Sequence, residues 1–143
     1  SYEERDRSNS PILIAEDSPL LSKLICECLR KAGYTNLIVN MNGQEAWDKL
    51  CEMKERGTVL DDVHCIITDI EMPLMDGHRL TKLVKENEVM KKIPVVIFSS
   101  LINEEIRLKG ESLGADAQLT KPEIGKLVSA IDGLIEKYEA GRK

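Results

Sequence analysis

The sequence predicts an α/β fold: a flavodoxin-like, doubly wound (βα)5 sandwich around a five-stranded parallel sheet in the order 2-1-3-4-5. Three observations predict it. Short, almost wholly apolar runs alternate along the chain with longer segments whose apolar residues recur at helical spacing. Strands that are apolar on both faces are typical of a parallel sheet covered by helices on each side. The 143 residues suffice for one domain of five such units.

The first two units are predicted from apolar runs and from residues that start or stop helices. Residues 12–15 form a short apolar strand. Ser18-Pro19 supplies an N-cap and then proline at the first helical position, and Gly33 marks the end of that helix. Residues 37–39 form the second strand. Asn42-Gly43 closes it and precedes a helix with apolar residues at helical spacing.

The last three units repeat the alternation. Strands are predicted at residues 63–68, 95–98 and 117–119, the last of them weak. A helix from His78 to Asn87 follows the third strand, and Asp76 is placed to cap it. Asn103 caps a helix to about Leu113. An amphipathic stripe from Ile124 to Tyr138 predicts the final helix.

Composition and charge describe an ordinary globular chain with a polar start. We expect residues 11–140 to form one domain and residues 1–10, SYEERDRSNS, to be a flexible tail or linker, because they are charged and lack any period. The net charge of −5 disfavours nucleic acid as a partner. No apolar run reaches the roughly 18 residues of a membrane span, and no secretory signal opens the chain. We therefore expect no membrane partner. Four cysteines without a C-x-x-C pair indicate reduced thiols in a cytoplasmic protein.

Polar side chains follow four of the predicted strands, at the edge where all parallel strands end. They are Glu16 and Asp17 after the first strand, Asp69 after the third, Ser99 and Ser100 at the end of the fourth, and Lys121 after the fifth. In the predicted order the first and third strands are neighbours, so the three acids converge, and ligands of such sheets bind at this edge.

Three carboxylates so close together normally raise the pKa of one of them, hold a hard cation, or both. Two unit charges about 4 Å apart repel by about 4 kcal/mol at an effective dielectric near 20. Oxygen donors without soft ligands favour Mg²⁺, which shares its sites with phosphate. A carboxylate can accept a phosphoryl group to form an aspartyl phosphate. We therefore interpret Asp69 as a nucleophile, with Mg²⁺ and Lys121 offsetting charge on the phosphoryl oxygens.

Together these residues resemble the response-regulator receiver domains, which are CheY-like. The resemblance covers residues 11–140 and rests on the pair Glu16-Asp17, on TDIEMPLMDG around Asp69, on VVIFSS, and on Lys121-Pro122 after GADAQLT. It implies that Asp69 is the phosphoacceptor and that Asp17 is a direct ligand of the metal. It also implies that Glu16 helps through water and that Glu71 offers its backbone carbonyl to the metal.

The resemblance assigns four further residues. It implies that Ser99 is the switch hydroxyl, that Lys121 contacts the phosphate, and that the bond before Pro122 is cis. Gly77 is expected to relieve a strained turn. Gln118 departs from the pattern, because many receivers carry an aromatic residue there that turns inward on activation. Coupling would then run through Ser99, the following loop and its helix, or through a hydrogen bond of Gln118.

Several longer stretches resemble one branch of the family, the receiver of CheV-type chemotaxis coupling proteins. They are AEDSPL, AGYTN, NGQEAWD, TDIEMPLMDGHRLTKL, IFSSLINEE and LGADAQLTKPEIGKLV. In such proteins the receiver follows a CheW-like coupling domain, which would link the chain to chemoreceptors. The resemblance implies the histidine kinase CheA as donor and adaptation of receptor-kinase signalling as output. Such a receiver is not an enzyme, since it catalyses only its own phosphorylation and dephosphorylation.

Three alternatives stay open. The chain could be a stand-alone CheY-like regulator that binds the flagellar motor, or a pseudo-receiver that is never phosphorylated, although such proteins typically lose an acid or the lysine. A haloacid-dehalogenase-type phosphatase also uses an aspartyl phosphate and Mg²⁺, and Asp69-Ile70-Glu71 resembles its D-x-D start. There, however, the nucleophile usually follows an early strand and substrate-covering insertions are common, whereas Asp69 follows the third strand and the loops here are short.

Overall fold

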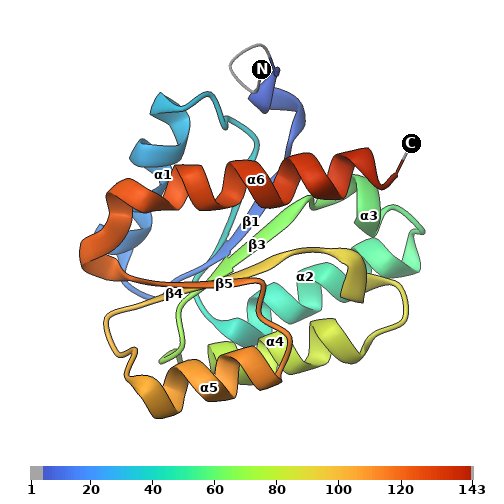
Figure 1. Cartoon of the computed structure of the whole chain (residues 1–143). Helices are drawn as coiled ribbons and strands as arrows, with labels where there is room; N and C mark the ends of the chain where they lie inside the picture. The colour runs from blue at the N-terminus through green and yellow to red at the C-terminus, as the bar shows by residue number, and fades with distance from the viewer. Residues whose placement is uncertain (1–4, 143) are drawn as a thin grey trace.

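The computed structural model describes residues 5–142 and contains one parallel sheet in the order β2-β1-β3-β4-β5, as predicted (Figure 1). The strands are β1 (Ile12–Ala15), β2 (Leu37–Asn40), β3 (Cys65–Thr68), β4 (Val95–Ser99) and β5 (Ala117–Thr120). The α-helices are α1 (Pro19–Lys31), α2 (Gly43–Glu55), α3 (Val59–Asp62), α4 (Gly77–Glu86), α5 (Glu104–Ser112) and α6 (Leu127–Ala140). Three 3₁₀-helices complete the described chain: η2 (Arg7–Asn9), η3 (Met90–Lys92) and η4 (Lys121–Lys126). The sequence did not predict α3 or the 3₁₀-helices.

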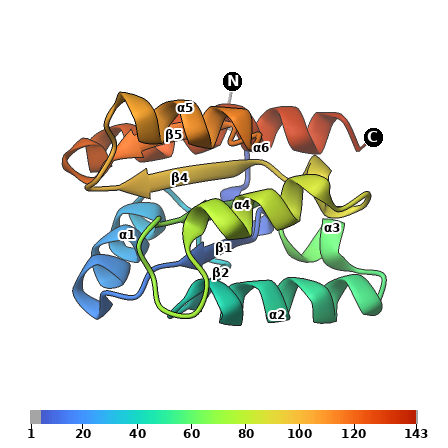
Figure 2. The ribbon, with the colours of Figure 1, turned by 90° about the horizontal axis from the view of Figure 1, so that it is seen from below.

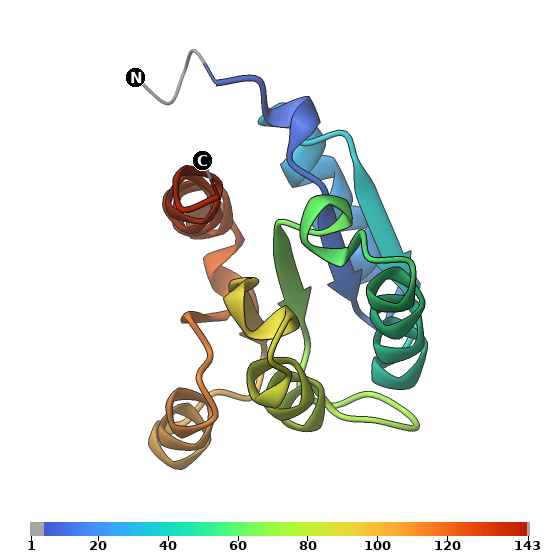
Figure 3. The same ribbon diagram turned by 90° about the vertical axis from the view of Figure 1, so that its right-hand side faces the viewer.

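Helices cover both faces of the sheet, with α1 and α6 on one side and α2, α4 and α5 on the other (Figures 1 and 3). Side chains alternate along β1 between these two layers: Ile12 and Ile14 pack with α1 and α6, whereas Leu13 and Ala15 pack with α2 and α4. This double covering explains why the strands read as continuous apolar runs. None of the helices within residues 5–142 is long and apolar enough to cross a membrane.

The loops after β1, β2, β3 and β4 each end in a capped helix. Their caps are the side chains of Ser18, Asn42, Asp76 and Asn103, which accept hydrogen bonds from the amides of Leu21, Glu45, Arg79 and Ile106. The caps therefore fix where each loop ends at the carboxyl edge of the sheet. In Figure 2 the arrowhead of β4 points to this edge, where the loop after β3 also lies.

The expectation of a flexible tail is wrong for residues 5–10, and residues 1–4 lie outside the described part of the chain. Arg5 Nη2 and Arg7 Nε each lie 3.0 Å from Asp132 Oδ1 on α6. Tyr34 donates a further hydrogen bond to the same carboxylate, and Ser10 donates one of 2.5 Å to Glu139. Because Asp132 is buried, it requires cationic partners, and the two arginines hold the segment against the domain.

We expect Asp132→Asn to lower the free energy of unfolding by about 3 kcal/mol at pH 7, because it leaves two arginines beside a neutral amide. Burial raises the pKa of Asp132, but hydrogen bonds from Arg7 and Tyr34 outweigh burial and hold the pKa below its usual range. Stabilisation by an acid with a lowered pKa is complete above the unfolded-state pKa and is lost as pH falls through the folded-state value. The difference between wild type and variant should therefore shrink below about pH 4.

Urea unfolding at several pH values measures this difference. The matched control is Asp61→Asn, because Asp61 forms an exposed ion pair with Arg142 and should contribute less than about 1 kcal/mol. Equal losses in the two variants would contradict the buried-pair interpretation.

Candidate functional site

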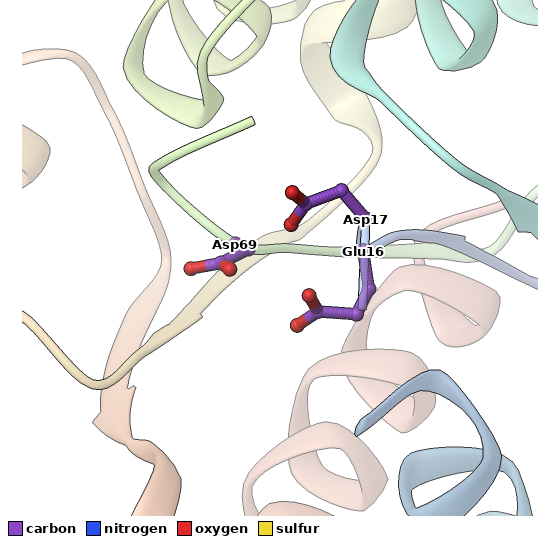
Figure 4. A group of neighbouring side chains, drawn as sticks. All are labelled: Glu16, Asp17 and Asp69. Carbon is purple, nitrogen blue, oxygen red and sulfur yellow. The ribbon is translucent and has the colours of Figure 1, made fainter. Parts of the chain in front are cut away.

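Three carboxylates meet where β1 and β3 end. Ala15 pairs with Thr68 in the register of the two strands, and the Asp69 amide donates a 3.0 Å hydrogen bond to the Ala15 carbonyl. Glu16, Asp17 and Asp69 each offer a carboxylate oxygen, and these oxygens lie within 4.8 Å of one another. Their carboxylates turn to the same side (Figure 4). Parallel pairing of neighbouring strands thus brings the predicted acids together.

The cluster is only partly open to solvent. Glu16 is buried, Asp69 is 8% exposed, and Asp17 is exposed. Burial raises the pKa of Glu16, hydrogen bonds from the Ser18 amide and Lys121 oppose it, and the charge of Asp69 raises it further; the net shift is upward. Burial and the charge of Asp69 therefore outweigh the hydrogen bonds that favour the Glu16 carboxylate.

Lys121 lies between two of the acids. Its Nζ is 2.9 Å from Asp69 Oδ2 and 2.9 Å from Glu16 Oε1. Burial lowers the pKa of Lys121, but the hydrogen bonds to Asp69 and Glu16 outweigh burial and raise it, so the side chain stays an ammonium. One ammonium among three carboxylates leaves two negative charges in excess, and all the donors are hard oxygens. This set of residues fits a divalent cation such as Mg²⁺.

Contacts within the loop after β3 fix the orientation of Asp69. The Ile70 amide donates to Asp69 Oδ1 at 2.7 Å, and Thr68 Oγ1 donates to the Asp69 carbonyl at 2.8 Å. Gly77 packs so closely that a Cβ there would lie 1.8 Å from the same carbonyl oxygen. Among residues 5–142, Leu74 is the non-glycine residue with a positive φ, and Gly77 is not in that region. Gly77 thus permits a close approach, which corrects the expected relief of a strained turn.

Ser99 lies at the end of β4 and is buried, whereas Ser100 is exposed. Its Oγ accepts a 3.2 Å hydrogen bond from the Leu101 amide and makes no direct hydrogen bond to Asp69 within the described chain. The Glu71 side chain is exposed and stands outside the carboxylate cluster. The structure therefore brings the side chains of Glu16, Asp17, Asp69 and Lys121 together. The roles expected of the Ser99 hydroxyl and of the Glu71 backbone carbonyl stay predictions.

The peptide bond between Lys121 and Pro122 is trans, so the expectation of a cis bond is wrong for this structure. Pro122 lies in the first turn of η4, a position that suits the fixed φ of proline. The Glu123 carboxylate accepts from the Thr120 amide at 3.1 Å and from its hydroxyl at 2.8 Å. This reciprocal cap satisfies the start of η4 with the favoured trans isomer in place.

Gln118 connects β5 to α5. Its Nε2 donates a 2.7 Å hydrogen bond to the Arg107 carbonyl, and its amide covers Gly110, where a Cβ would lie 2.4 Å from Gln118 Oε1. That oxygen is buried without a hydrogen-bond partner in the part of the chain described. Gly110 was not predicted from the sequence, because its need for a missing Cβ arises only when helix and strand meet.

Acids at the ends of β1 and β3, with a lysine after β5, define a receiver-type α/β domain whose chemistry lies at one edge of the sheet. The chain matches the model of the response regulator receiver domain over residues 12–132 and belongs to this family. Receiver domains act in two-component signalling, where they bind Mg²⁺ at an acidic pocket and take phosphoryl groups from histidine kinases.

Curated relatives carry the matching region within longer proteins. The chain is 33% identical over 125 residues to a gliding motility regulatory protein of Myxococcus xanthus, covering 86% of this chain and 15% of that protein. It is 30% identical over 133 residues to the sensor histidine kinase CheAY of Helicobacter pylori, and the match covers 90% of this chain and 16% of that protein. It is 33% identical over 114 residues to chemotaxis protein CheV1 of the same organism, and the match covers 80% of this chain and 34% of that protein. The chain thus spans well under half of each of these relatives.

Solved structures agree with the fold. A signal receiver domain of a histidine kinase from Syntrophus aciditrophicus aligns with a TM-score of 0.76 at 30% identity, covering 90% of this chain and 91% of that one. The Mn²⁺-bound form of response regulator Rcp1 aligns with a TM-score of 0.72 at 26% identity, covering 86% and 91%.

Proposed function

We propose that this receiver domain accepts a phosphoryl group on Asp69 from a histidine kinase. The main support is the position of Asp69 at the end of a buried strand. Its Oδ2 lies 2.9 Å from Lys121 Nζ, and its carboxylate offers an oxygen within 4.8 Å of carboxylate oxygens of Glu16 and Asp17. This arrangement supports the proposal because it would supply a nucleophile, a cation for the phosphoryl oxygens and a set of metal ligands at one edge of the sheet.

In the proposed step an Asp69 oxygen attacks the phosphorus of a phosphohistidine. A P–O bond forms, the P–N bond breaks, and the imidazole leaves with that electron pair and then takes up a proton. The Ile70 amide holds Asp69 Oδ1, so the carboxylate presents Oδ2 on the side of Lys121. Lys121 is then placed to pair with an oxygen of the transferred group.

Asp17, Asp69 and the Glu71 carbonyl would hold Mg²⁺, with Glu16 assisting through water; the ion would neutralise charge that develops on the phosphoryl oxygens. The cluster of carboxylate oxygens supports this assignment, and the Mn²⁺-bound form of a similar response regulator is a further reason to test a divalent ion.

The output of phosphorylation would pass through β4 and α5. A phosphoryl group on Asp69 offers acceptor oxygens to the buried Ser99 hydroxyl, which now accepts from the Leu101 amide. Turning Ser99 toward the phosphate would release that amide and move the loop leading to α5. Gln118, bonded to the Arg107 carbonyl of α5, would follow the helix. This route needs no aromatic side chain at position 118.

We further propose that the donor is CheA and that the chain works as the receiver of a CheV-type protein in chemotaxis adaptation. The motif resemblance supports this, as does the likeness to CheV1. A CheW-like domain encoded in the same protein and phosphotransfer from CheA would both be expected. A gene that encodes only the receiver would favour the stand-alone CheY-like alternative.

The central test is incubation with Mg²⁺ and acetyl phosphate, followed by intact mass spectrometry. We expect one phosphoryl adduct per chain, lost when EDTA replaces Mg²⁺, because the excess negative charge of the cluster would then repel the donor. Beryllofluoride with Mg²⁺ should shift amide signals of the β4–α5 loop. Absence of both an adduct and a shift would refute the proposed function and favour a pseudo-receiver.

A further inference from the structure

A cleft of about 550 Å³ lies at the amino edge of the sheet, opposite the Asp69 site. It is bounded by the C-terminal half of α6, by α3 and by the segments that lead into β4 and β5 (Figure 1). Pro94 and Asp116, which directly precede these two strands, line it from the side of the sheet. Because parallel strands share one carboxyl edge, a cleft at their amino ends is separate from the phosphoacceptor pocket.

Much of the lining of this cleft is apolar. Leu60 and Leu134 are half-buried, and Pro94 and Tyr138 are buried. The Tyr138 hydroxyl donates a 2.6 Å hydrogen bond to the Leu60 carbonyl, and this bond ties α6 to α3. The walls are therefore held together without a ligand. Clefts of roughly 300–1,000 Å³ with mainly apolar linings are typical of small-molecule sites.

Two of the four charged residues that line the cleft already have partners. Asp116 lies 2.9 Å from the Lys85 ammonium and accepts a 2.8 Å hydrogen bond from the Val95 amide. Arg142 pairs with Asp61. The charges of Asp116 and Arg142 are thus balanced within the domain.

The other two charged residues, Lys92 and Lys137, are exposed, and their ammonium groups form no hydrogen bond or ion pair within residues 5–142. No acid stands three or four residues from Lys137 along α6, so its own helix offers no partner. The whole chain carries a charge of −5, whereas this cleft has two cations in excess. A ligand that matches both features is apolar in its body and anionic at one end.

We propose that this cleft binds a small organic anion. An aromatic or branched apolar body would lie against Leu60, Pro94 and Leu134, with a carboxylate, sulfonate or phosphate group facing Lys92 and Lys137. Two lysines are too few to hold a polyanion such as nucleic acid, and the volume matches one small molecule. The inference goes beyond the proposed function, because no residue of the cleft belongs to the Asp69 site.

The test uses anilinonaphthalene sulfonate, an aromatic anion whose fluorescence rises in an apolar site. Phenylnaphthylamine, which has the same rings without the sulfonate, is the neutral comparison. The variant is Lys137→Glu. Its matched control is Lys82→Glu, which makes the same change of charge at an exposed lysine of α4 outside the cleft. Amide shifts in NMR spectra locate the bound probe, and the melting temperature shows whether it binds the folded state.

We expect saturable binding of the sulfonate to the wild-type chain, weakened about 10-fold by Lys137→Glu and less than about twofold by Lys82→Glu. The neutral amine should bind about 10-fold more weakly than the sulfonate, because it gains nothing from the lysines. Amide shifts should concentrate at Leu60, Leu134 and Gly141. The probe should raise the melting temperature, since a ligand of the native state stabilises it.

Equal weakening by the two substitutions, or equal affinity for the neutral amine, would overturn the proposal, because the lysines of the cleft would then not select the anion. A lowered melting temperature would also overturn it, since the probe would be binding partly unfolded chain. So would amide shifts confined to another surface, including the hollow lined by Leu101, Ile102 and Ile106, or no saturable binding up to about 1 mM. None of these outcomes depends on phosphorylation of Asp69, so a failure of the proposed function would leave this test unaffected.

Discussion

Asp69→Asn is expected to abolish labelling by acetyl phosphate and by kinase alike. The asparagine amide has nearly the shape of the carboxylate and can still accept the 2.7 Å hydrogen bond from the Ile70 amide. It lacks the negative oxygen that attacks phosphorus, so the loss is chemical and not structural. Intact mass after incubation with Mg²⁺ and acetyl phosphate should show unmodified protein only.

A measurement of stability distinguishes this loss of labelling from a loss caused by misfolding. Removing one of three clustered negative charges relieves repulsion with Glu16, so the variant should be at least as stable as wild type in the absence of metal. Asp76→Asn is the matched control in the same loop: Asp76 caps α4 through the Arg79 amide, and asparagine caps about equally well. Labelling that persists in Asp69→Asn would show that another acid is the phosphoacceptor.

Much of the fold follows from signals that lie close together in the sequence. A run such as residues 12–15 is apolar because helices bury both faces of the strand. Three helices are capped by side chains that accept from amides only three residues away: Ser18, Asp76 and Asn103. The acidic pocket also follows, once the strand order is assumed, because parallel strands share one carboxyl edge.

Features that depend on distant partners could not be predicted in this way. The polar segment at residues 5–10 is indistinguishable from a tail until Asp132, more than a hundred residues away, is placed beneath it. Asp132 itself appears in the sequence only as a polar position on an amphipathic helix. The trans bond at Pro122 differs from the isomer that the family resemblance implied, and no pattern near Pro122 in the sequence distinguishes the two isomers.

Backbone conformation is a second feature that could not be predicted from the sequence. A glycine or asparagine at position 74 would have signalled a left-handed turn, whereas leucine gives no such signal. Likewise, Gly77 marks a turn in the sequence, but only the structure reveals that its missing Cβ makes room for the carbonyl of Asp69.

Gly77→Ala is expected to destabilise the domain by at least about 3 kcal/mol and to impair phosphorylation at the same time. The new Cβ would lie 1.8 Å from the Asp69 carbonyl oxygen, 2.8 Å from its carbon and 3.0 Å from Ile70 Cα. All three are backbone atoms, so no side chain can rotate away, and relief requires β3 and α4 to separate. The atom that must move first belongs to the phosphoacceptor itself, which would carry the Asp69 carboxylate away from Lys121.

Gly133→Ala supplies the opposite control within the same chain. Gly133 lies inside α6, and a Cβ there meets no atom within 4 Å. Alanine is favoured over glycine in a helix interior, so this variant should gain roughly 0.5–1 kcal/mol. Urea unfolding gives both free energies, and acetyl phosphate labelling under folding conditions gives the activity. Because the two substitutions add the same methyl group, a Gly77→Ala variant that is as stable and as readily labelled as Gly133→Ala would show that the loop after β3 does not hold Asp69 in place.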